Sequence, residues 1–66
     1  MNIVVYRIYT RGKHDKRFRG HWFETDSFER LDEMLTRIVR LDNEEGRRGT
    51  SYQIRKGKEV IREVWN

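Results

Sequence analysis

The chain has 66 residues and carries 15 basic and 11 acidic side chains, for a net charge of +4. This length allows one domain, residues 1–66, and the absence of cysteine excludes a disulfide framework and a thiolate zinc site. The longest apolar run, Ile3–Tyr6, is far shorter than the roughly 20 residues that span a bilayer, so we expect a folded cytoplasmic protein that makes no membrane contact.

The first segments predict a β-hairpin. Residues 2–10 are rich in β-branched and aromatic side chains, which favour a strand, and residues 18–25 form the returning strand across a loop at 11–17. Both faces of the first strand carry apolar side chains, so we place this strand in the interior of a sheet. Gly20 in the second strand indicates a bulge or the close approach of another group.

The clearest element is an amphipathic helix over about residues 26–41. Asp26 is the predicted N-cap, and Glu29 three residues later completes a capping-box pattern. At about 100° per residue, one arc of the helix collects the apolar side chains Phe28, Leu31, Met34, Leu35, Ile38, Val39 and Leu41. Asp42 would fall in the middle of that arc, so the pattern predicts that the packed helix ends near Leu41.

A second hairpin follows the helix. A turn-rich connector at residues 42–49 leads into two predicted strands, which are at residues 50–55 and 58–65. A two-residue loop at Lys56–Gly57 would set Tyr52 beside Ile61, whereas a three-residue loop at Arg55–Gly57 sets Tyr52 beside Val60. We favour the longer loop, because it groups apolar side chains on one face: Tyr52, Ile54, Val60 and Val64.

The order ββαββ predicts an α+β fold of two layers, a four-stranded antiparallel sheet with the helix packed on one face. The opposite face of the sheet then meets water or a partner. The candidates for that face are Arg7, Tyr9, Arg19, His21, Gln53, Arg55, Ile61, Arg62 and Trp65.

Charge alternates along the chain in a way that favours an anionic partner. Residues 1–23 carry six bases and one acid, residues 24–45 carry eight acids and three bases, and residues 46–66 carry six bases and two acids. Basic side chains neutralise phosphates, and aromatic rings between them stack on bases. We therefore predict a small non-enzymatic protein that binds the phosphate backbone of DNA or RNA, DNA being favoured. The candidate binding residues are Arg7, Tyr9, Arg11, Lys13, Lys16, Arg17, Arg19, His21 and Arg55.

Residues 6–35 resemble the AP2-like arm-DNA-binding domains of phage-type integrases. The resemblance rests on "RGK" at 11–13 and on "FET" at 23–25, just before the helix. It implies that the sheet enters the major groove with Arg7, Arg17 and Arg19 as contacts, and that the protein comes from a phage or another mobile element. The chain differs from that family in its two predicted strands before the helix, where the family has three, and in its added hairpin after the helix.

Other chemistries find less support in the sequence. His14, Asp15 and His21 lack the spacing of a metal site, and Ser27 and Ser51 have no nucleophile signature around them, so we expect no metal, no cofactor and no enzyme. A small RNase that uses His21 would need a second proton-transfer group. "GRRG" at 46–49 lies outside any P-loop pattern.

The alternative function is a protein-interaction module or inhibitor of the phage type, without nucleic-acid binding. Trp22 and Trp65, each near a strand end, fit either buried packing or an interface. A last strand that exposes Ile61 and Trp65 would also let two copies pair as a homodimer.

Overall fold

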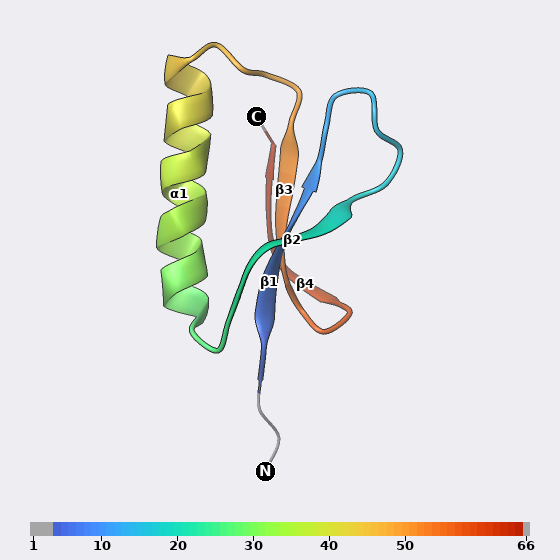
Figure 1. Cartoon of the computed structure of the whole chain (residues 1–66), viewed down its shortest axis with the longest axis vertical. Helices are drawn as coiled ribbons and strands as arrows, with labels where there is room; N and C mark the ends of the chain where they lie inside the picture. The colour runs from blue at the N-terminus through green and yellow to red at the C-terminus, as the bar shows by residue number, and fades with distance from the viewer. Residues whose placement is uncertain (1–3, 66) are drawn as a thin grey trace.

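A computed structural model describes residues 4–65, except for the side chains of His21 and Trp22. The elements in chain order are β1 (Tyr6–Arg11), β2 (Arg19–Thr25), α1 (Phe28–Glu44), β3 (Ser51–Lys56) and β4 (Glu59–Trp65). The strands form one antiparallel sheet in the order β2-β1-β3-β4, and α1 lies along one face of it (Figure 1). This architecture confirms the predicted two-layer α+β fold and the interior position of the first strand.

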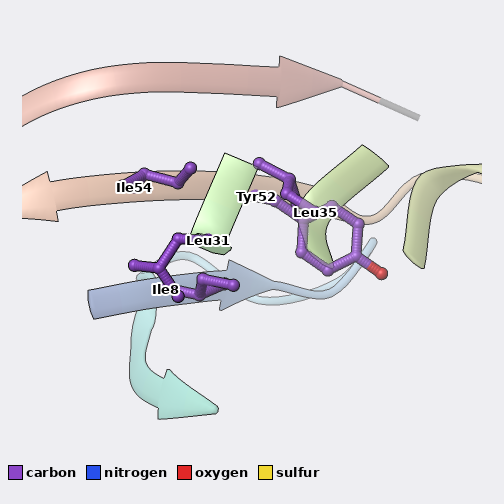
Figure 2. Close-up of a cluster of buried hydrophobic side chains, with 5 residues drawn as sticks. All are labelled: Ile8, Leu31, Leu35, Tyr52 and Ile54. Carbon is purple, nitrogen blue, oxygen red and sulfur yellow. The ribbon is translucent and has the colours of Figure 1, made fainter. Parts of the chain in front are cut away.

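The core lies between α1 and the two central strands. Figure 2 shows its five buried side chains, Ile8, Leu31, Leu35, Tyr52 and Ile54. Partly buried side chains surround them: Tyr6, Phe28, Met34, Ile38, Val39 and Val64. Full burial of a side chain of this size stabilises the fold by about 1.5–3 kcal/mol relative to exposure. The predicted apolar stripe of the helix is therefore confirmed with one exception, because Leu41 remains 54% exposed.

The helix begins later than the sequence predicts. Ser27, not Asp26, is the N-cap, and its hydroxyl oxygen accepts a hydrogen bond from the Arg30 backbone N–H at 3.4 Å. The Ser27 N–H in turn donates to the Thr25 hydroxyl at 3.3 Å, which fixes the turn between β2 and α1. The predicted Asp26–Glu29 capping box is wrong because two neighbouring residues could both cap, and the turn selects the second.

The helix also ends later than predicted, at Glu44. Asp42 does fall within the apolar stripe, and it is 7% exposed. Its carboxylate accepts a hydrogen bond from the hydroxyl of Tyr52 on β3, so the buried charge has a polar partner. The polar residue that suggested a helix end is accommodated by the facing strand.

The register of the second hairpin differs from the predicted one. Lys56 pairs with Glu59 across a two-residue turn, in which Gly57 has a φ of +61°. Tyr52 pairs with Val64, so the predicted neighbour Val60 lies opposite Arg55, on the other face of the sheet. The turn residues are Gly57 and Lys58, one residue later than in the two-residue loop considered, and a β-bulge in β4 shifts the register again between Ile54 and Arg55. For these two reasons neither considered loop gives the observed pairing.

Candidate nucleic-acid interface

The face of the sheet opposite α1, which we call the open face, is set by alternation along the strands. Tyr6 and Ile8 of β1 pack towards the helix, so the side chains between and after them lie on the other side. Cross-strand partners share a face, and the register extends the open face over three strands. Its residues on β1, β3 and β4 are Arg7, Tyr9, Arg11, Ser51, Gln53, Arg55, Val60, Glu63 and Trp65.

A stack of alternating aromatic rings and guanidinium groups lies at this face. The Arg11 Cζ atom lies 5.3 Å from the Trp65 ring centroid and 5.0 Å from that of Phe18. The Arg55 Cζ atom lies 5.6 Å from the Phe18 centroid and 4.2 Å from that of Tyr9. These distances are within the ~6 Å range of cation–π attraction, so each guanidinium is held between two rings. We call the set Trp65–Arg11–Phe18–Arg55–Tyr9 the stack.

The position of Arg55 is fixed by a further contact. Its Nε–H donates to the Gln53 side-chain oxygen at 2.8 Å, and Gln53 is 7% exposed. Tyr9 also lies next to the opposite strand, because a Cβ atom at Gly20 would lie 3.5 Å from the Tyr9 ring. This is an ordinary van der Waals distance, so the space beside Gly20 does not require a glycine. Of the two predicted features, the bulge is the one found, as an irregularity of β2 between the partners of Arg7 and Tyr9.

Arg7 differs from the arginines of the stack because it already has an anionic partner. Its Nε–H donates to the Glu24 carboxylate of β2 at 2.7 Å. This hydrogen bond, together with the charge of Glu24, raises the pKa of Arg7 further above its ordinary value. Arg7 lies on the open face as predicted, but a phosphate would have to compete with Glu24 for it.

The loop at residues 12–18 carries most of the remaining basic candidates. The Gly12 N–H donates to the Asp15 carboxylate at 3.2 Å, and the Asp15 N–H donates to the Gly12 carbonyl at 3.1 Å. Asp15 therefore closes the turn, while Lys13, Lys16 and Arg17 are exposed. Figure 1 shows this loop extending away from α1, at the end of the β1–β2 hairpin.

The loop rests on the connector between α1 and β3. Gly49 has a φ of +91°, and a Cβ atom placed there would lie 2.9 Å from both Cβ and Cγ of Lys13. The stem of Lys13 thus lies directly against the Gly49 backbone, beside the exposed Arg48. The GRRG segment and the basic loop, distant in the sequence, are neighbours in the fold. Arg47 of the same segment pairs with Glu45 at 3.0 Å.

Two basic residues assigned to the open face lie elsewhere. Arg19 pairs with Thr10, which pairs in turn with Tyr52, so the register places Arg19 in a row on the helix side of the sheet. Arg62 is also on the helix side, where its guanidinium binds the Asp32 carboxylate of α1. Regular alternation accounts for both positions, because Arg19 adjoins Gly20, which lies opposite Tyr9, and Arg62 is two residues from Val64, which lies opposite Tyr52. The side chains of His21 and Trp22 lie outside the described residues.

Several basic side chains near the open face have no carboxylate partner within 4.0 Å in the described part of the chain. They are Arg11, Lys13, Lys16, Arg17 and Arg55, and Arg19, on the helix side of the sheet, also has none. Sequence reasoning did not include Phe18 or Trp65 among the site residues, although their rings are members of the stack. Phe18 could have been identified from the sequence, because it is an aromatic residue between Arg17 and Arg19 at the end of a basic loop.

No protein-family model, no curated protein and no solved structure matches this chain. The resemblance to integrase arm-binding domains therefore stays a prediction. Among residues 4–65, no helix combines the length and the apolar character that crossing a membrane requires. Within the same described residues, no three histidine, aspartate or glutamate side chains come together as metal ligands.

Proposed function

We propose that this protein binds nucleic acid without catalysing a reaction, and that it uses the open face of the sheet together with the loop at 12–18. The observation that carries the proposal is the stack, in which Arg11 and Arg55 are held between aromatic rings and have no carboxylate partner among the described residues. Solubility alone would explain charged side chains on an exposed sheet face. It does not explain why the two arginines alternate with the aromatic rings of Trp65, Phe18 and Tyr9.

The chemistry of the stack suits a polynucleotide. A guanidinium presents a planar fork of N–H donors that matches a phosphate, and an aromatic ring offers a surface for a base. Since the arginines are already ordered by the rings, less side-chain entropy is lost when they bind. The basic loop would extend the phosphate contacts beyond the sheet.

The stack favours unpaired bases, because base faces are free to stack on side chains only where a strand is not in a duplex. We infer that single-stranded DNA is the preferred form. A duplex would engage the protein differently, through insertion of the β1–β2 ribbon and its loop into a major groove.

Fluorescence anisotropy with labelled single-stranded and duplex DNA of one sequence tests the proposal. If about five phosphates are neutralised, the slope of log K against log salt is about −3.5 for the single strand and about −4.5 for the duplex. Tighter binding to the duplex would contradict the role of the stack and favour the ribbon. No binding to either form at low salt would remove the proposal and leave a protein-interaction module as the alternative.

A double substitution tests the phosphate contacts themselves. Arg11→Ala, on the open face, with Arg17→Ala, in the loop, is expected to weaken binding at least about tenfold, a change of ~1.4 kcal/mol, while the fold remains intact. The matched control is Arg37→Ala with Arg40→Ala, which removes the same charge from exposed positions of α1. Equal losses in both proteins would show that only net charge matters. Melting of the first protein would make those arginines structural.

A further inference from the structure

Strand β4 is an edge of the sheet, since the strand order ends with it. Its outer side carries the unpaired backbone groups of an edge, and Val60 and Ile61 on it are 43% and 41% exposed. Edge strands often carry charges that keep other chains from pairing with them. The charges of β4 and of its turn are instead ordered so that they favour pairing with a second copy of the chain.

The segment Lys58–Glu63 reads KEVIRE and is complementary to itself when two copies run antiparallel. Pairing around a centre between Val60 and Ile61 places those two residues opposite each other across the junction. The same register sets Glu59 opposite Arg62 and Lys58 opposite Glu63. Every cross-strand pair is then either apolar with apolar or acid with base, which are the combinations that stabilise a sheet.

A regular strand could not use this register. Side chains alternate between faces, so two residues three positions apart, such as Glu59 and Arg62, would lie on opposite sides of the sheet. Residues that pair across a symmetric antiparallel junction must lie on the same side. The charge pattern alone is therefore insufficient for this pairing. The alternation of side chains along β4 has to be interrupted between Glu59 and Arg62, so that both lie on the same side of the sheet.

The β-bulge makes that change. Val60 lies opposite Arg55 and Arg62 lies opposite Ile54, so Ile61 is the extra residue of the bulge. Glu59 pairs with Lys56, which is two residues from Ile54 on β3 and on the same face. The bulge therefore brings Glu59 and Arg62 to the helix side of the sheet together.

We propose that two copies of this chain pair through their β4 edges as a symmetric antiparallel dimer, with the twofold axis between Val60 and Ile61. The interface is isologous, so each contact occurs twice. Arg62 also binds Asp32 of its own chain, and the five N–H donors of a guanidinium suffice for both carboxylates. The pairing does not depend on nucleic-acid binding, because the paired segment Lys58–Glu63 contains no residue of the stack.

Analytical ultracentrifugation of the nucleic-acid-free protein over a range of concentrations tests the dimer. An edge contact of this length is small, so we expect a dissociation constant in the micromolar to millimolar range. Lys58→Glu and Glu63→Lys, at exposed positions, each place like charges together at both ends of the junction. Each is expected to raise the dissociation constant at least about tenfold. Lys16→Glu and Glu44→Lys are the controls with the same change of charge.

The mixture of the two variants gives the sharper result. The acidic side chain introduced at position 58 of one chain then faces the basic side chain introduced at position 63 of the other at one end of the junction. At the other end, the native Glu63 of the first chain faces the native Lys58 of the second. Equimolar K58E and E63K should therefore form a heterodimer of about wild-type affinity, although each alone is monomeric. Circular dichroism checks that each variant is folded. A wild-type protein that stays monomeric throughout, or a mixture that does not associate, overturns the proposal.

Discussion

The hydroxyl of Tyr52 on β3 donates a hydrogen bond to the buried carboxylate of Asp42 in the last turns of α1. This contact joins the end of the helix to the centre of the sheet, next to the core residues Leu35 and Ile54. It places a carboxyl group within the apolar stripe of the helix, where the Tyr52 hydroxyl is its hydrogen-bond partner.

Removal of that donor is expected to destabilise the protein. Tyr52→Phe leaves the Asp42 carboxylate buried without its partner, at a cost of about 1–3 kcal/mol in the free energy of unfolding. Tyr6→Phe is the control, since no hydrogen bond of the Tyr6 hydroxyl is found within the described chain, and its effect should stay within ~0.5 kcal/mol. Urea unfolding measures both. A second change, Asp42→Leu, should recover most of the loss, and additive losses would contradict this account.

The same contact predicts a loss of stability in alkaline solution. Burial, followed by the hydrogen bond and charge of Asp42, raises the pKa of Tyr52 above its ordinary value of 10.0. The unfolded chain therefore ionises first, so the stabilisation is complete below pH ~10 and is lost as pH rises towards the higher folded pKa. Unfolding free energy measured from pH 9 upwards should fall more steeply for the wild type than for Tyr52→Phe. Parallel curves would exclude this linkage.

The ion pair between Asp32 and Arg62 is expected to contribute little. Both side chains are more than a third exposed, at 40% and 36%, so solvent screens their attraction. Asp32→Asn should reduce the free energy of unfolding by about 0.2–1 kcal/mol, and added salt should shrink that difference. Glu33→Gln, the neighbouring exposed position, removes the same charge without breaking the pair. A loss that persists in high salt would show that the contact is more buried than its exposure indicates.

Substitutions at two glycines allow the cost of backbone strain to be measured separately from the cost of steric crowding. Gly46 and Gly49 have φ values of +74° and +91°, but only at Gly49 would an added Cβ atom meet a neighbour, the Lys13 side chain at 2.9 Å. Gly46→Ala should cost about 1–2 kcal/mol for the left-handed conformation alone. Gly49→Ala should cost at least ~1 kcal/mol more, because the loop must move. Thermal unfolding compares them, and Lys13→Gly in the Gly49→Ala background should remove the excess.

Trp65 allows the proposed stack to be tested without loss of the fold. Because its side chain is 67% exposed, Trp65→Ala should leave the unfolding free energy nearly unchanged. If a base stacks there, affinity for single-stranded DNA should fall by about 1–3 kcal/mol. Leu41→Ala, at a 54% exposed position on the helix, is the control. Unchanged DNA affinity in the Trp65 variant would remove this residue from the interface.

The elements of this fold were predictable from the sequence because each depends on local pattern. The helix stripe follows from spacing around Leu31 and Leu35, and the interior place of β1 follows from its two apolar faces. The order of the strands was not predictable, since either hairpin edge could have formed the central pair.

Apart from the choice of N-cap and hairpin turn, the main errors concern features that a local pattern does not reveal. Asp42 was judged unfit for an apolar stripe because its partner is ten residues away on a strand. Arg7 was judged available for phosphate because the sequence does not show that Glu24, 17 residues on, lies across the hairpin. Val60 was assigned to the wrong face because a bulge leaves no clear mark in a short alternating segment.

The close approach of Lys13 to Gly49 has a mechanical consequence. Because the Lys13 side chain packs directly against the backbone of Gly49, the loop at 12–18 and the connector between α1 and β3 are expected to move together. The connector continues directly from the helix end at Glu44. Lys13 of the loop therefore contacts the segment that leads from the end of α1 into β3. We therefore expect a ligand that displaces the basic loop to displace also the connector, next to the helix end that the Tyr52–Asp42 hydrogen bond holds.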